Sequence, residues 1–292
     1  MIGTPRPRTD VRLRQSRVHS PGELWAAYIL LGIFCLITLF PLFVMVSVSL
    51  IPSQTLAPSL YHLWPAHPRL ANYITMWHDL PIAHFLMNSL IIALGSTVVA
   101  LAVGIPAGFA LSRTKVFGRR IWLFLFLATQ MFSPSMIIVS AYHVMSVLHL
   151  TDSYFGLIFL DSGFYCLPFV VWIIAGFMRQ IPQELEEAVD IDGASSWQKL
   201  WRIFTPIAAP VIAVAGVYAF IASWNDFAFA LTLATSQSLM PLPIGVYSFI
   251  GAYSIQWNYL MGASLVATIP ILVLFLVLQR RLTSGIMAGT IR

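Results

Sequence analysis

The amino-acid sequence predicts an all-α protein that crosses a lipid bilayer several times. Of its 292 residues, 59% are apolar and only 9% are charged, which is too little charge to cover a water-facing surface. The chain also contains six stretches without Asp, Glu, Lys or Arg, and a bilayer crossing needs about 20 mostly apolar residues. These stretches cover residues 24–68, 80–112, 121–151, 162–178, 203–225 and 227–279.

Six transmembrane helices are predicted, and each contains a proline. Proline removes a backbone hydrogen bond and kinks a helix, which would suit a moving pore. The alternative is that proline is simply more frequent in membrane helices than in soluble ones. The predicted spans are about 25–50, 85–111, 121–145, 155–178, 206–224 and 258–280, with prolines at Pro41, Pro106, Pro134, Pro168, Pro210 and Pro270.

The distribution of lysine and arginine predicts which ends of the spans face the cytoplasm. An even number of spans places both termini on one side. Fifteen of the 16 basic residues fall on that side, and only Arg69 falls on the other. Basic residues resist translocation, so both termini are predicted to be cytoplasmic. The net charge of +5 then reflects topology, and no nucleic-acid partner is expected.

No second folded domain is predicted. The chain divides into a cytoplasmic N-terminal arm at 1–24, a membrane domain at 25–281 and a cytoplasmic C-terminal tail at 282–292. The polar segments between spans are too short to build a core of their own. The proline-rich outer segment 51–84 is predicted to be an irregular cap at the membrane interface.

The segment 179–206 is a strongly polar loop between two spans. It holds five of the eleven acidic residues of the chain. Side chains recur at helical spacing over 183–192, which predicts a short helix. We call residues 183–206 the elbow, because a second helix is predicted to follow the first after a turn.

The predicted turn and second helix depend on a few residues. Gly193 can take a left-handed conformation and end the first helix. Ser195 or Ser196 can cap a second helix over 197–204, which stops near Pro206. Such an elbow could pass force from a docked soluble partner into the spans. The alternative is an amphipathic hairpin on the lipid headgroups, which its carboxylates oppose because anionic headgroups repel them.

The elbow resembles the EAA loop of binding-protein-dependent ABC importer permeases. That pattern is Glu-Ala-Ala, three residues, Gly, nine residues and Ile-x-Leu-Pro. It stands here as Glu187-Ala188-Val189, Gly193 and Ile203-Phe204-Thr205-Pro206, with both spacings kept. Valine replaces the second alanine and threonine replaces the leucine, and both replacements are of similar size.

Further motifs are similar to those of the carbohydrate-uptake branch, in particular to the smaller permease subunit of the maltose transporter. They are Asn88-Ser89, Ala110-Leu-Ser-Arg113, Ile181-Pro182, Asp190-Ile-Asp-Gly-Ala194, Trp224-Asn225-Asp226 and Gly285-Ile-Met-Ala-Gly289. The resemblance implies the MetI-like permease fold in a bacterial inner membrane. It also implies a second, homologous permease subunit, two ATPase subunits and an extracytoplasmic solute-binding protein as partners. The end of the chain, Gly289-Thr-Ile-Arg292, departs from the family pattern.

The resemblance and the positions of polar residues give three sets of candidate site residues. The ATPase-coupling set is Glu184, Glu187, Ala188, Asp192, Gly193 and Ala194. Polar or aromatic residues in or beside spans are candidates for the pore or substrate path, namely Asp161, Tyr165, Trp224, Asn225 and Asp226. Contacts with the binding protein are expected at Gly251, Ala252 and Tyr253, by analogy with the maltose system.

No catalytic residue or cofactor is predicted in this chain. A phosphate-binding loop needs Gly-Lys-Ser/Thr, and neither Lys115 nor Lys199 follows a glycine. ATP and Mg²⁺ would therefore be bound by the partner ATPase. Cys35 and Cys166 lie inside predicted spans, so neither a disulfide nor a metal site is expected.

Two questions stay open at this stage. An ion-coupled secondary transporter or channel subunit is the main alternative, although it should carry charged groups at mid-membrane. The expected cargo is a sugar or oligosaccharide, with glycerol phosphate esters as an alternative. An acidic saccharide is also considered, because Arg69 and several outer histidines leave that face somewhat basic; these are His62, His67, His78, His84 and His149.

Overall fold

The computed structural model describes residues 21–52, 64–251 and 255–288. Apart from one isolated bridge between Ile250 and Ile255, the described part is built from helices and the loops between them. Its elements are α1 Pro21–Ser49, α3 Ala71–Asp79, α4 Ile82–Arg113, α5 Arg119–Thr129, α6 Pro134–Val147, α7 Tyr154–Leu160, the π-helix η2 Asp161–Cys166, α8 Leu167–Met178, α9 Gln183–Ile191, α10 Ser196–Lys199, the π-helix η3 Leu200–Phe204, α11 Thr205–Ile207, α12 Ala209–Trp224, α13 Ala228–Leu233, α14 Leu242–Tyr247 and α15 Trp257–Ala288.

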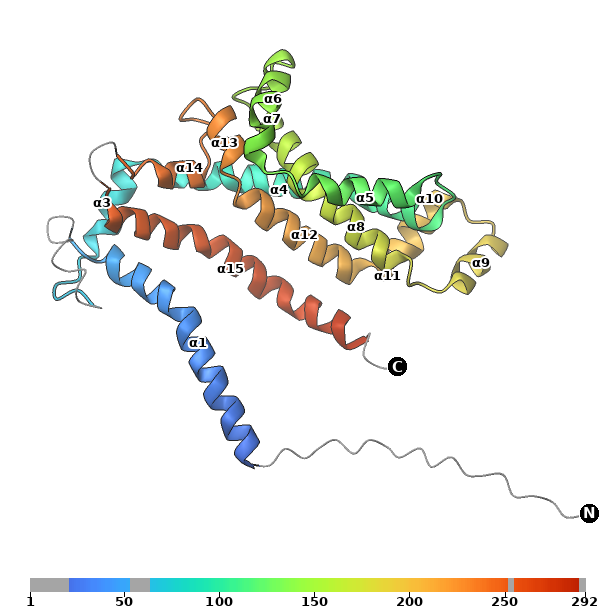
Figure 1. The fold of residues 1–292 in the computed structure, drawn as a ribbon, viewed down its shortest axis with the longest axis horizontal. Coiled ribbons are helices and arrows are strands. Elements are labelled where there is room, and N and C mark those ends of the chain that lie inside the picture. The colour runs from blue at the N-terminus through green and yellow to red at the C-terminus, as the bar shows by residue number, and fades with distance from the viewer. Residues whose placement is uncertain (1–20, 53–63, 252–254, 289–292) are drawn as a thin grey trace, which may run out of the picture.

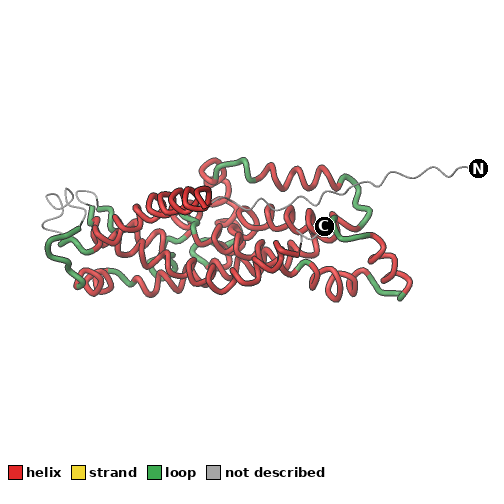
Figure 2. The backbone as a smooth tube through the Cα atoms, turned by 90° about the horizontal axis from the view of Figure 1, so that it is seen from below, coloured by secondary structure: helices red, strands yellow, loops and turns green. Residues whose placement is uncertain are grey.

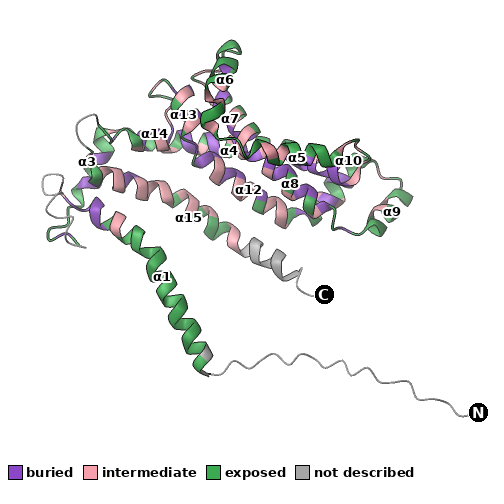
Figure 3. Ribbon diagram, viewed as in Figure 1, coloured by how far each residue is buried: buried purple, intermediate pink, exposed green. Residues whose placement is uncertain are grey.

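Helices α4, α8 and α12 form the centre of an elongated bundle (Figures 1 and 2). Helix α4 packs on both α8 and α12, and α15 adds to the other side of α12. Helix α9 lies at one end of the bundle and α3 at the other, where α1 and α15 meet. Helix α1 diverges from the bundle, and Figure 3 shows that most of its length is exposed. An apolar helix exposed in this way suits a lipid or protein environment.

Four helices are long and apolar enough to cross a bilayer as single spans. They are Leu24–Ser49, Ile82–Arg113, Tyr154–Met178 and Trp257–Gln279. Two further pairs of helices are long and apolar enough only when each pair, bent at a short break, is counted as one span. The described residues therefore supply up to six spans. The predicted first, second, fourth and sixth spans are thereby confirmed as helices.

The predicted third span, 121–145, corresponds to a bent pair of helices and is not one continuous helix. It is broken between α5 and α6, which meet at 100°. The cause is local, because Pro134 disfavours a helical conformation in the residue before it. Ser133 is accordingly extended, with φ −67° and ψ 138°, and Pro134 begins α6.

The predicted fifth span, 206–224, also needs correction. The second helix of the elbow ends at Ile207, one residue after Pro206 and near the predicted stop, so the fifth span does not begin at Pro206. The chain then bends by 81° and α12 begins at Ala209. Of the six span prolines, Pro41, Pro106, Pro168 and Pro270 lie inside continuous helices, whereas Pro134 and Pro210 lie in the first turns of α6 and α12.

The fourth span contains the π-helix η2 just before Pro168. Proline cannot donate to the carbonyl one turn earlier, so that region of the backbone needs other partners. The side-chain amide of Gln130, at the end of α5, donates to the carbonyl oxygens of Phe164 and Tyr165 at 3.4 and 3.2 Å. A side chain from the break in the third span thus supplies hydrogen bonds to the π-helix of the fourth span.

Helices α4 and α8 approach closely because α4 presents glycines to α8. A Cβ on Gly104 would lie 2.5 Å from Cγ1 of Val170, and one on Gly108 would lie 2.8 Å from Cγ2 of Ile174. Small residues at such contacts are the usual means by which membrane helices pack tightly. The two helices therefore form a closely fitted pair.

The connecting segments are more ordered than predicted. Within the predicted irregular cap 51–84, residues 71–79 form α3, and Asn72 donates to the carbonyls of Ser49 and Ile51 at 2.9 Å each. Between α6 and α7, Asp152 accepts from the backbone of the α13–α14 connection. The backbone N–H of Ser236, aided by its hydroxyl and by Thr235, holds the pKa of Asp152 below its ordinary value, although slight burial opposes this.

Candidate functional site

The elbow consists of α9, a glycine turn and the irregular helix that begins with α10. Helix α9 has no buried residue, and Gly193 has φ +73°, which is the left-handed conformation predicted for it. Ser195 caps the second helix: its hydroxyl accepts from the N–H of Gln198 at 3.3 Å, and the Gln198 side chain accepts from the N–H of Ser195 at 2.9 Å. The predicted helix, turn and cap are confirmed.

An ion pair fixes the angle between the two arms of the elbow. Lys199 on α10 contacts Asp190 on α9. The lysine side chain is only 11% exposed, whereas that of Asp190 is 55% exposed. Because the lysine is largely buried, its loss would leave a cavity as well as break an ion pair. This pairing was not predicted from the sequence.

The outer surface of α9 combines acidic and apolar side chains. The predicted residues Glu184, Glu187, Ala188, Asp192 and Gly193 are exposed, and Ala194 is half-buried. Two large apolar side chains lie on the same elbow, with Ile191 87% and Trp197 64% exposed. Ile191 was not among the predicted site residues, although an isoleucine next to the glycine turn was a usable signal. Exposed apolar groups rimmed by charges are typical of a protein interface.

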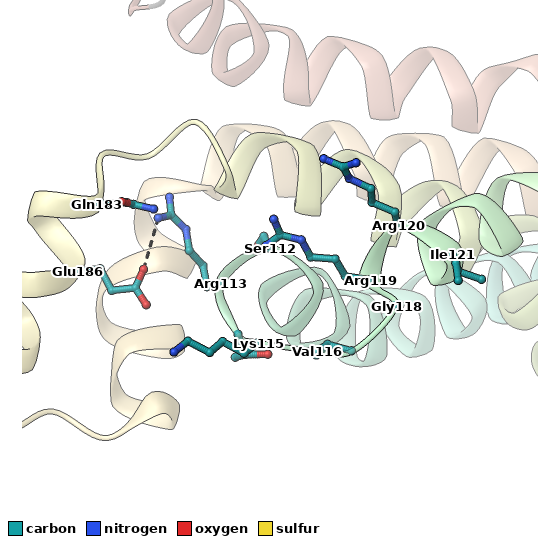
Figure 4. Close-up of a pocket in the computed structure, with 11 residues that line it drawn as sticks. Ser112, Arg113, Lys115, Val116, Gly118, Arg119, Arg120, Ile121, Gln183 and Glu186 are labelled. Carbon is teal, nitrogen blue, oxygen red and sulfur yellow. Dashed lines mark hydrogen bonds and ion pairs between the residues drawn. The ribbon is translucent and has the colours of Figure 1, made fainter.

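Arg113, the last residue of α4, joins the elbow to the membrane helices (Figure 4). Its Nε donates to the carbonyl of Met178 at 2.9 Å, and its Nη2 contacts the carbonyls of Met178 and Ile181. Its Nη1 lies 3.3 Å from Oε2 of Glu186 on α9. The guanidinium also lies over the ring of Phe204, 5.1 Å from its centre.

This set of contacts makes Arg113 a junction of four segments. The side chain is only 6% exposed, and it donates to the carbonyl of Met178, the last residue of α8, and to the carbonyl of Ile181 in the connection to α9. Arg113 belongs to the Ala-Leu-Ser-Arg motif noted in the sequence, but its contacts were not predicted. Beside it, a cavity of about 660 Å³ opens between the end of α4 and the start of α5, and Lys115, Arg119 and Arg120 line it (Figure 4).

The structure brings together four of the predicted pore candidates, Asp161, Tyr165, Trp224 and Asp226. Ser223 on α12 donates to Oδ2 of Asp161 at 2.5 Å, and Tyr165 donates to Oδ1 of Asp226 at 3.0 Å. Asp161 and Asp226 are buried, and both line the same small cavity. Ser223 was not among the predicted residues.

Trp224 also lines this cavity, and the remaining candidates lie apart from it. Trp224 is buried and stacks on Phe220, with ring centres 5.5 Å apart, whereas Asn225 is exposed. Gly251 is exposed beside the Ile250 bridge, and the predictions for Ala252 and Tyr253 fall outside the described residues. A role of these residues in the pore or in docking a binding protein stays a prediction. Across the described ranges, no group of three or more His, Cys, Asp or Glu side chains gathers as metal ligands would.

The fold and the elbow define a permease of the binding-protein-dependent type. Residues 100–286 match the family described as the binding-protein-dependent transport system inner membrane component, and the chain belongs to this family. It is therefore a multi-pass membrane protein and a transport component. The ion-coupled alternative is not retained.

Similar proteins share most of the length of the chain. The trehalose/maltose transport system permease protein MalG of Thermococcus litoralis is 32% identical over 90% of this chain and 94% of its own. The sulfoquinovosyl glycerol transport system permease protein SmoH of Agrobacterium fabrum is 31% identical over 78% of this chain and 80% of its own. A chain of a bacterial ABC transporter involved in the import of alginate has the same fold, with a TM-score of 0.66, 16% identity and coverage of 89% and 95%.

Proposed function

We propose that this chain is one of two permease subunits of an ATP-driven importer for a saccharide. The support is the similarity to a trehalose/maltose permease over nearly the whole chain, together with the matching motifs at Asn88-Ser89 and Trp224-Asn225-Asp226. The second permease would complete the pore. A solute-binding protein would deliver the saccharide to the outer side of the bacterial inner membrane, opposite the cytoplasmic termini.

The elbow is the proposed docking site for the ATPase subunits, which would bind ATP and Mg²⁺. The observation that carries this proposal is an exposed α9 held at a fixed angle. Its outward surface has no partner within the described chain, while Lys199 and Arg113 fasten its inner side to the bundle. Glu187 is exposed and free to form charge-assisted hydrogen bonds with donors on the ATPase.

A pair of substitutions tests the coupling role. Glu187→Lys with Gly193→Asp reverses a charge on α9 and adds a carboxylate side chain at the exposed glycine turn, where φ is +73°. We expect the subunit to reach the membrane and the complex to lose ATP-driven uptake. Asp79→Lys is the matched control, because Asp79 is an exposed carboxylate on α3 at the other end of the bundle. Normal uptake by the double variant would reject the elbow as the coupling element.

Crosslinking gives a direct readout of the docked partner. A cysteine at Ala188 in a background without Cys35 and Cys166 should be captured by an ATPase subunit carrying a thiol-reactive probe. The same cysteine at Asp79 should not. Failure of Ala188→Cys to capture the ATPase in an assembled, active complex would contradict the docking proposal.

The class of saccharide is testable through the partner protein. Calorimetric titration of the solute-binding protein with neutral and uronic-acid oligosaccharides should show binding of at least one series. A strict preference for neutral sugars would remove the acidic alternative. Binding of glycerol phosphate esters, with no response to any saccharide, would reject the saccharide assignment while leaving the importer assignment intact.

A further inference from the structure

A buried carboxyl group lies within the fourth span and has only one hydrogen-bond donor. Asp161, the first residue of η2, has no exposed surface. Its Oδ2 accepts from the hydroxyl of Ser223 at 2.5 Å. Its Oδ1 has no hydrogen-bond partner in the described chain and is itself buried. A buried polar atom without a partner is costly, and a charged one costs much more.

A second carboxyl group beside it is well supplied with donors. Oδ1 of Asp226 accepts from the hydroxyl of Tyr165 at 3.0 Å and from the N–H of Phe229 at 3.3 Å. Its Oδ2 accepts from the N–H of Ala230 at 2.9 Å. Three donors are the environment in which a carboxylate keeps its negative charge.

The two carboxyl groups line one cavity of about 10 Å³, which has room for a single water molecule. No basic side chain lines it; the other lining residues are Ser89, Ile92, Leu157, Ser223, Trp224, Ala230, Pro241 and Pro243. Three titratable side chains interact electrostatically with Asp161. Tyr165 and Cys166 belong to η2, and Asp226 belongs to the α12–α13 connection. None of these can supply a compensating positive charge.

Two adjacent carboxylates without a cation cannot both stay ionised at this depth, because each destabilises the charge of the other in a medium of low dielectric. We propose that Asp161 and Asp226 together bind one proton, which is carried on Oδ1 of Asp161 and points into the cavity. Asp226 keeps the negative charge because its three donors face it. The O–H of Asp161 then donates to Asp226 or to one water molecule between them, and Oδ2 is the carbonyl oxygen that accepts from Ser223.

The bound proton holds three parts of the bundle together. Asp161 belongs to the π-helix of the fourth span, Ser223 to the end of α12, and Asp226 to the connection between α12 and α13. Loss of the proton would set two negative charges against each other at this junction. The site is therefore a proton-dependent link between the fourth and fifth spans, and it is independent of which cargo the transporter carries.

Infrared spectroscopy of the purified transporter complex tests the proposal, because a protonated carboxyl group has a carbonyl band separate from the bands of carboxylates. We expect wild type at neutral pH to show a buried carboxylic acid band that is missing in Asp161→Asn and retained in Asp226→Asn. Ser223→Ala should shift the band to higher frequency, because the carbonyl oxygen loses its hydrogen bond. The asparagine variant is a fitting control, since an amide has the shape of the neutral acid.

Three results would overturn the proposal. Identical spectra of wild type and Asp161→Asn would mean that Asp161 is ionised. A band that is present only when sodium is omitted would mean that a metal cation occupies the site. If Asp161→Asn does not assemble, an unshifted band in Ser223→Ala would reject the assignment. As a supporting readout, raising the pH should lower the melting temperature of wild type more than that of Asp161→Asn.

Discussion

Substitution of Arg113 by alanine should loosen the attachment of the elbow to the membrane helices. The change removes the guanidinium donors of the Met178 and Ile181 carbonyls, the ion pair with Glu186 and the contact with the Phe204 ring. The Met178 carbonyl keeps the N–H of Ile181 at 3.4 Å, so the Ile181 carbonyl is the one that loses its donor. An unsatisfied buried carbonyl costs about 1–3 kcal/mol. The ion pair with the 22% exposed Glu186 adds about 0.5–1 kcal/mol, because solvent screens it. The contact of the guanidinium with the Phe204 ring adds about 0.5–1 kcal/mol, so the total is about 3 kcal/mol.

Hydrogen exchange measures this local loss in the assembled, nucleotide-free transporter. A decrease of about 3 kcal/mol in the free energy of local opening accelerates exchange by roughly 100-fold, since about 1.4 kcal/mol corresponds to tenfold. The effect should appear in amides of residues 178–191 and should be absent from α3. Uptake should fall in parallel, while ATP hydrolysis by the complex should become less dependent on the solute-binding protein.

Two matched variants separate the contributions of Arg113. Arg113→Lys keeps the charge but cannot reproduce the planar fork that reaches two carbonyls, so its exchange should lie between wild type and alanine. Glu186→Gln removes only the ion pair, whose acidic side chain is 22% exposed, and should change exchange only a few-fold, or by about 0.5–1 kcal/mol. Wild-type exchange over 178–191 in Arg113→Ala would refute the assignment of Arg113 as the junction.

Three further predictions concern the turn, the helix contact and the outer connection. Gly193→Ala should cost about 1–2 kcal/mol by thermal unfolding, because an L-residue is strained in the left-handed region, and Gly193→Asn should cost less. Gly104→Ala should lower the melting temperature, since its Cβ would lie 2.5 Å from a valine on α8, whereas Gly176→Ala meets nothing within 4 Å and should be neutral. Asp152 has a lowered pKa, first because of the backbone N–H of Ser236, so its stabilisation is present above its ordinary pKa and is lost as the pH falls through the folded value. The melting temperature of wild type should therefore fall more than that of Asp152→Asn on acidification below about pH 4, and equal falls would contradict this.

The sequence was sufficient to predict the features that depend on residues close together in the chain. Uninterrupted apolar stretches predicted α1, α4 and α15, because a bilayer selects length and hydropathy directly. Gly193 and Ser195 predicted the turn and cap of the elbow, since the left-handed conformation and the capping hydrogen bond need those residue types. Counting apolar residues could not show the break before Pro134. The usable signal was the proline itself, which disfavours helix in the preceding residue, although Pro41, Pro106 and Pro270 are accommodated inside helices.

Contacts between distant segments could not be predicted in the same way. Arg113 and Glu186 are 73 positions apart, and the Asp161 and Ser223 side chains join across 62 positions. No periodicity in the sequence pairs such residues, because their meeting depends on how α4, α8 and α12 pack. Polarity inside an apolar span did mark Asp161 as unusual, since an ionisable group there needs a specific partner. It could not identify that partner.

The packing of α4 on α8 places the junction at Arg113 and the buried acid pair in one mechanical unit. Arg113 ends α4 and holds the end of α8, while Asp161 opens the π-helix that continues into α8. Between them, Gly104 and Gly108 bring the two helices into contact so close that a Cβ would collide. Helices fitted this tightly transmit displacement rather than absorb it. A shift of α9 should therefore reach the Asp161 region, and crosslinking α4 to α8 should preserve this transfer, whereas Gly104→Ala should weaken it.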